Sequence, residues 1–106
     1  MTLRTALLAF LMLAPAAAQA QPPGLAILKT SNAYLDCLIR AARKLDDGRS
    51  AAAVASATQS ACVKEEHRWE DAQTANYSAE KKRDFLEGIK AHTAVIATQI
   101  VLEGRR

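Results

Sequence analysis

The stretch that decides the fold is residues 34–63, which read YLDCLIRAARKLDDGRSAAAVASATQSACV. Its first part spaces apolar residues three and four positions apart, as on one face of a helix: Tyr34, Cys37, Leu38, Ala41 and Leu45. Gly48 suits the left-handed conformation that often follows a helix. Ser50 can cap a second helix, which begins with alanines, the residues of highest helix propensity. We therefore predict two helices joined by a tight turn.

The two cysteines of the chain, Cys37 and Cys62, lie at equal distances on either side of this turn. In an antiparallel hairpin their side chains would be level, and the neighbouring alanines allow the Cα separation of about 4.4–6.8 Å that a disulfide needs. No Cys-x-x-Cys redox motif and no Cys-x-x-Cys-His haem motif is present. His67 is off the helical face of Cys62, which disfavours a catalytic thiol. We predict a structural Cys37–Cys62 disulfide.

The N-terminal residues show the three parts of a secretory signal: a basic residue, an apolar run over residues 6–14, and small residues ending at Ala20. The apolar run is shorter than the ~20 residues that a membrane span needs. We expect a cleaved signal peptide over residues 1–20, an extended leader over residues 21–30, and one helical domain over residues 31–106. The pattern predicts a periplasmic or secreted protein, a location in which a disulfide persists.

The rest of the chain is also expected to be helical, which gives an all-α domain of three helices built on the disulfide-linked antiparallel hairpin. We place the start of the first helix at Ser31 or Asn32 and extend the second helix through the charged stretch of residues 64–71. Ser78 is the predicted cap of the third helix. Residues 94–102 are rich in β-branched side chains, so a strand is the alternative there, but they show no regular alternation. We expect no membrane span after the leader.

Composition and motifs argue against several classes of function. The formal net charge is +3, and residues of both signs alternate along the chain, which argues against nucleic-acid binding. The sequence has no glycine-rich phosphate loop and no Gly-x-Ser-x-Gly elbow. A helical chain of this size also offers little room for an enclosed pocket. We therefore expect a protein that is not an enzyme and needs no cofactor.

One candidate site is the polar cluster around His67. His67, Glu70 and Asp71 share a helical face and could hold a metal ion weakly, but a solvated, ion-paired surface is the commoner use of such a cluster. Trp69, the single tryptophan, is either a core-closing residue or an interface anchor.

The apolar run near the C-terminus is the second candidate site. Its apolar residues extend around more than one side of the helix, so they need more than one neighbour. Either Leu25, Ile27 and Leu28 of the leader cover them, or they form a contact surface. The candidate interface residues in this run are Val95, Ile100, Val101 and Leu102.

The pattern of Tyr34, Cys37 and Leu38, the turn at residues 45–50 and the pair Ala61-Cys62 resembles small exported helical proteins of proteobacteria that carry one cysteine pair. The resemblance covers part of the chain, implies the helical fold and export, and supplies no activity or functional residue. We expect a non-enzymatic interaction protein that binds an unknown macromolecular partner or a second copy of itself. The alternatives are an acid-stress chaperone, loosened by protonation, and a weak metal or small-ligand binder at the His67 cluster.

Overall fold

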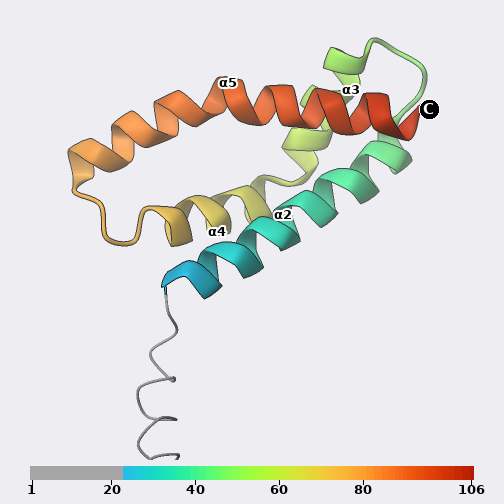
Figure 1. Cartoon of the computed structure of the whole chain (residues 1–106). Coiled ribbons are helices and arrows are strands. Elements are labelled where there is room, and N and C mark those ends of the chain that lie inside the picture. The colour runs from blue at the N-terminus through green and yellow to red at the C-terminus, as the bar shows by residue number, and fades with distance from the viewer. Residues whose placement is uncertain (1–22) are drawn as a thin grey trace, which may run out of the picture.

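The computed structural model describes residues 23–106, and over this range it contains four α-helices and no strand (Figure 1). The helices are α2 (Pro23–Leu45), α3 (Ala51–Ala61), α4 (Val63–Gln73) and α5 (Ala79–Gly104). The all-α class is therefore confirmed. The expected signal peptide, residues 1–20, lies outside the described residues.

The first helix starts earlier than the sequence indicated. α2 begins at Pro23, so the expected extended leader is helical from that residue on, and the helix start expected at Ser31 or Asn32 is wrong. Proline is favoured in the first turn of a helix because its fixed φ fits and its missing N–H has no helical acceptor there. The Thr30 hydroxyl donates to the carbonyl of Ala26 at 2.7 Å, inside the helix. Residues 23–45 therefore form one continuous rod.

The turn between α2 and α3 agrees with the prediction. Gly48 has a φ of 86°, in the left-handed region, and the Ser50 side chain accepts a hydrogen bond from the Ala53 N–H at 3.2 Å. Ser78 caps α5 in the same way, through the Lys81 N–H at 3.2 Å. Because both serines satisfy an N–H that the first turn leaves free, both helix starts are fixed locally.

The predicted second helix is divided in two at Cys62. There φ is −112° and ψ is 20°, and the Cys62 N–H donates to the Gln59 carbonyl, three residues back. The break redirects the chain so that α3 packs on α5 and α4 packs along α2 (Figure 1). A three-helix domain was expected; the described residues form four helices because the second one bends at the disulfide.

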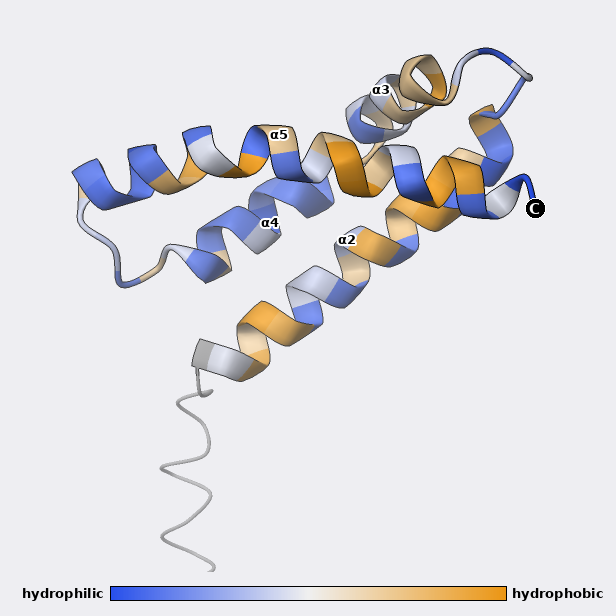
Figure 2. Ribbon diagram, turned by 45° about the horizontal axis from the view of Figure 1, so that its top comes forward, coloured by the Kyte–Doolittle hydropathy of each residue, from blue (hydrophilic) through white to orange (hydrophobic). Residues whose placement is uncertain are grey.

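Two small clusters of buried side chains form the core. The first joins three helices: Ala42 of α2, Val54 and Ala55 of α3, and Ala97 and Val101 of α5. The second consists of Tyr34, Leu38 and Cys62, and Ile100 packs against both clusters. Since α3 and α5 meet through alanines, their backbones approach closely. The core therefore lies along one side of α2, and α4 presents a mostly hydrophilic ribbon (Figure 2).

Candidate functional site

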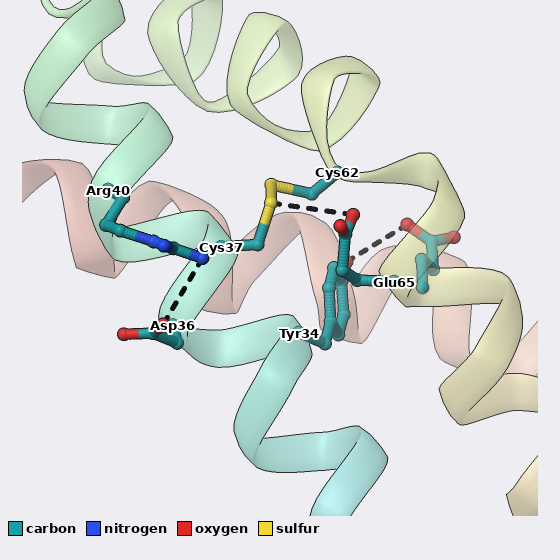
Figure 3. The surroundings of a disulfide bond; sticks show 7 residues. Tyr34, Asp36, Cys37, Arg40, Cys62 and Glu65 are labelled. Atoms are coloured by element: carbon teal, nitrogen blue, oxygen red, sulfur yellow. Dashed lines mark hydrogen bonds and ion pairs between the residues drawn. A yellow bond between two sulfur atoms is a disulfide. The ribbon is translucent and has the colours of Figure 1, made fainter.

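The predicted disulfide is present. Cys37 of α2 is bonded to Cys62, their Cα atoms are 6.0 Å apart, and Cys62 is fully buried (Figure 3). A carboxylate oxygen of Glu65 lies 3.6 Å from the Cys37 sulfur, which as half of a disulfide has no proton to donate. Neither sulfur is free to act as a nucleophile. Such a disulfide belongs to an oxidising, non-cytoplasmic compartment.

A partly buried hydrogen bond lies next to the disulfide. The Tyr34 hydroxyl donates to a carboxylate oxygen of Glu66 at 3.0 Å, and Tyr34 is 5% exposed (Figure 3). Burial raises the pKa of the Tyr34 phenol, and the negative charge of Glu66 raises it further. Tyr34 therefore stays protonated and acts as a fixed donor that ties α2 to α4.

Trp69 belongs to a row of aromatic rings that connects α2, α4 and the start of α5. Its ring stacks on Tyr34 with centroids 6.0 Å apart, and it meets Phe85 at 6.3 Å. Tyr77 lies edge-on to Phe85 at 5.8 Å, and the Lys81 ammonium is 4.2 Å from the Tyr77 centroid. Such contacts stabilise the packing of the helices on one another. Of the two roles considered for Trp69, closure of the core is the one that this position serves.

The structure does not gather the expected metal ligands. His67 and Asp71 are exposed, and Asp71 is 3.6 Å from the ammonium of Lys82. Burial raises the pKa of Glu70, with a further contribution from the charge of Glu66. Within residues 23–106, the three-ligand set whose donor atoms lie within 4.8 Å is a different one: Cys37, Cys62 and Glu65. Both of its sulfurs are consumed in the disulfide.

The C-terminal apolar run is divided between core and surface. Val101 is buried and Ile100 packs against both clusters, whereas Val95 is 54% and Leu102 47% exposed. The run is helical, as expected, and not a strand. Leu25, Ile27 and Leu28 do not cover it, because they lie at the N-terminal end of α2, opposite the end that meets the C-terminus (Figure 1).

A groove opens between the second half of α2 and the last turns of α5. Its volume is about 530 Å³. Apolar side chains line it, and charged side chains stand among them: Ile39, Ala42, Ile100 and Val101, with Arg43 and Glu103. This composition suits an apolar side chain flanked by polar groups rather than a small charged ligand.

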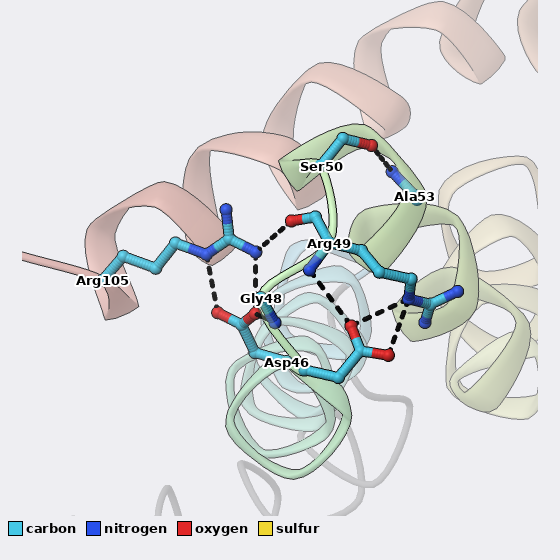
Figure 4. A network of polar contacts seen from close by, with 7 residues as sticks. Asp46, Gly48, Arg49, Ser50, Ala53 and Arg105 are labelled. Atoms are coloured by element: carbon cyan, nitrogen blue, oxygen red, sulfur yellow. Dashed lines mark hydrogen bonds and ion pairs between the residues drawn. The ribbon is translucent and has the colours of Figure 1, made fainter.

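An ion pair lies beside the groove and joins α5 to the turn after α2. The Arg105 guanidinium donates to both carboxylate oxygens of Asp46, at 2.8 and 2.7 Å, and to the Arg49 carbonyl at 2.6 Å (Figure 4). The hydrogen bonds that Asp46 accepts from Arg105, followed by one from the Gly48 N–H, lower the pKa of Asp46 to about 2. We call this contact the Asp46–Arg105 clamp.

A row of exposed apolar side chains leads along α2 into this groove. Leu25, Leu28, Leu35 and Ile39 are 39%, 57%, 37% and 40% exposed, and we call them the α2 stripe. Ile39 also lines the groove, so stripe and groove form one surface. Sequence reasoning missed this surface because the expected helix start near Ser31 separated Leu25 and Leu28 from the pattern. In a helix that starts at Pro23, the spacing of Leu25, Leu28, Leu35 and Ile39 places all four side chains on one face, and this spacing is the signal in the sequence.

α5 has the length and apolar composition of a membrane-crossing helix, contrary to the expectation that no later segment does. It also supplies Thr93, Ala97 and Val101 to the packed interior. Insertion into a membrane would separate these residues from α2 and α3. In the structure, α5 therefore packs as a core helix of the domain.

No protein-family model, curated protein or solved structure matches this chain at a significant level.

Proposed function

We propose that this protein is a non-enzymatic interaction protein, periplasmic or secreted, that binds another polypeptide through the α2 stripe and the adjoining groove. One observation carries the proposal: four large apolar side chains in a row on one helix, each more than a third exposed, continue into an apolar groove. Contiguous apolar surface of this kind is typical of contact sites between proteins. The disulfide anchors the opposite side of α2, which keeps the surface preformed.

The surface also has the form that helix recognition requires. A groove between two helices accepts an amphipathic helix whose apolar residues recur every three or four positions. Arg43 and Glu103 stand at the groove with opposite charges, so they can fix the direction of a bound segment.

Site-specific photo-crosslinking in the producing cell tests this proposal. A photoreactive amino acid replaces Leu35 in the stripe, Val95 on α5, or Arg68 on the exposed side of α4. We expect a discrete polypeptide adduct from the Leu35 position and none from the Arg68 position. The same yield from all three positions, or no adduct from Leu35, would contradict a contact surface on α2. An adduct only from Val95 would move the contact to α5.

A second candidate function, an acid-stress chaperone, would rest on the Asp46–Arg105 clamp. Protonation of Asp46 would release α5 beside the groove and expose apolar surface. Because the pKa of Asp46 is held at about 2, this release needs strong acid. A scan with a dye that binds apolar surface, from pH 7 to pH 2, tests the idea, and an unchanged signal throughout would reject it.

The third expectation, weak metal or small-ligand binding at the His67 cluster, has no support from the observed geometry. Isothermal titration with zinc or copper remains its direct test, and an absence of heat would remove it.

A further inference from the structure

We propose that the partner of the α2 stripe is a second copy of this chain, which pairs α2 against α2 in antiparallel orientation about a two-fold axis near Asn32. This inference rests on the proposed function, because it names the polypeptide that the surface binds. It follows from the spacing, the symmetry and the charges of α2.

The spacing on α2 is that of a helix pair. Leu25, Leu28, Asn32, Leu35, Ile39 and Ala42 alternate steps of three and four residues. This is the heptad pattern by which two helices pack side by side, with Leu25, Asn32 and Ile39 in one register position and Leu28, Leu35 and Ala42 in the other. At 1.5 Å per residue the row is about 26 Å long. All but Ala42 are at least a third exposed in the single chain.

The row is nearly symmetric about Asn32. Leu25 lies seven residues before Asn32 and Ile39 seven residues after it. Leu28 lies four residues before Asn32, and Leu35 lies three residues after it. When two such rows run in opposite directions, Leu25 of each copy meets Ile39 of the other, and Leu28 meets Leu35. The same patch on both copies is what a two-fold interface requires.

Asn32, the polar member of the row, fits the same arrangement. On the axis it meets Asn32 of the second copy, and each amide can both donate and accept a hydrogen bond. A single asparagine at this kind of position sets the register and the number of helices, at a cost in stability.

Charged residues beside the row select the antiparallel direction. Lys29 follows Leu28, and Asp36 follows Leu35, so both lie on the same flank of the row. Antiparallel pairing brings Lys29 of each copy to Asp36 of the other, whereas parallel pairing would place both residues against the opposite flank of the second copy, which carries Gly24, Ser31 and Leu38 and no charge. Asp36 is exposed and its present partner, Arg40 at 3.3 Å, is also exposed, so the carboxylate can accept a second cation.

The groove accounts for the ends of the contact. Ile39 belongs to both the row and the groove, so Leu25 of the second copy is placed at the groove mouth, close to Ala42. One apolar side chain from each copy thereby enters the groove of the other. A contact of this length is at the small end of specific interfaces, so we expect a dimer that depends on concentration rather than an obligate one.

Sedimentation velocity on the oxidised protein, from micromolar to millimolar concentration, tests the contact. We expect a monomer–dimer equilibrium, and Leu28→Glu should weaken it by about tenfold or more because it places two charges in the apolar row. Val95→Glu is the matched control, since Val95 is 54% exposed and Leu28 57%, and it should leave the equilibrium unchanged. A monomer at every concentration, or equal effects of the two variants, would overturn the proposal.

Charge exchange tests the direction. Lys29→Asp alone should weaken the dimer about fivefold, and Lys29→Asp combined with Asp36→Lys should restore it to within about twofold. In a parallel pair neither residue faces a charge of the second copy, so Lys29→Asp alone would leave the dimer unchanged and the exchange would have nothing to restore, which would overturn the antiparallel arrangement. The crosslinking experiment separates this inference from the proposed function. A monomer whose Leu35 adduct contains a different polypeptide rejects the second copy alone, and a monomer without any adduct rejects both.

Discussion

The two long faces of α2 are both apolar, but they differ in what covers them. The inner face carries Tyr34, Cys37 and Leu38, and it is closed by α4, the disulfide and Trp69. The outer face carries the α2 stripe, and its side chains remain at least a third exposed. Full burial of a leucine is worth about 1.5–3 kcal/mol, so the inner face carries most of the stability that α2 contributes. The apolar side chains of the outer face are not yet fully buried, so their burial can stabilise a contact between molecules.

Truncation of one leucine on each face should separate these roles most strongly. Leu38 is fully buried, so Leu38→Ala should lower the free energy of unfolding by about 2–5 kcal/mol, through lost burial and the cavity left behind. Leu28→Ala should change it by less than about 0.5 kcal/mol, because surface substitutions seldom exceed that. Denaturant unfolding at low protein concentration measures both. Equal losses would mean that the two faces are not distinct in the folded monomer.

Loss of the disulfide should have the next largest effect. The bond closes the loop formed by α2, the turn and α3, and on the chain-entropy model this stabilises by about 3 kcal/mol. For a domain of this size the Tm should fall by more than about 10 °C in the Cys37→Ala, Cys62→Ala double variant. Thermal unfolding with and without excess reductant gives the comparison, and the double variant should not respond to reductant. If excess reductant leaves the Tm of the natural protein unchanged, the disulfide does not contribute to the thermal stability of the inner face.

The Tyr34–Glu66 hydrogen bond should have a smaller effect on the same face. Tyr34→Phe keeps the ring on Trp69 but removes the donor to the Glu66 carboxylate. We expect a loss of about 1 kcal/mol, the usual net value of a hydrogen bond. Glu66→Gln should lose less, since its amide still accepts from the hydroxyl. A larger loss in Glu66→Gln than in Tyr34→Phe would show that the charge of Glu66, and not the phenol, matters there.

Much of the inner face could be predicted from the sequence, because its signals are local. The alternation around Cys37 and Leu38, the glycine at residue 48 and the cap at Ser50 each act within a few residues, and they agree with the cysteine spacing. The break at Cys62 could not be predicted in this way. The helix propensity of residues 51–73 is continuous, and only the contacts of α3 with α5 and of α4 with α2 call for a bend.

The outer face was missed for a different reason. Residues 21–30 are predicted to be an extended leader because the stretch carries Pro22-Pro23 near its start, although proline is well placed in the first turn of a helix. That interpretation removed Leu25 and Leu28 from the helix and with them half of the stripe. The C-terminal run shows the reverse error: Val101 was a candidate interface residue, but Ala55 and Ala97 let α3 and α5 approach closely enough to bury it. Which apolar residues stay exposed depends on such distant neighbours.

The Asp46–Arg105 clamp should have the smallest effect, at the place where the outer surface meets α5. Asp46 has a pKa of about 2 instead of its ordinary 3.8, so the folded chain binds this proton more weakly than the unfolded chain. The contribution of the pair is therefore complete above about pH 4 and is lost as the pH falls toward 2. In Arg105→Gln we expect the pKa of Asp46 to rise toward its ordinary value, but not fully, because the Gly48 N–H still donates.

An NMR titration of the Asp46 carboxyl measures this rise directly, and Arg106→Gln is the matched control. Arg106 is the next residue and pairs with Glu103 at 3.5 Å, so its loss removes the same charge without touching Asp46. An equal rise in both variants would mean that general positive charge, and not the clamp, sets the pKa of Asp46. A rise confined to Arg105→Gln, with dimerisation unchanged, would show that a polar lock positions α5 beside the groove while the α2 stripe makes the contact.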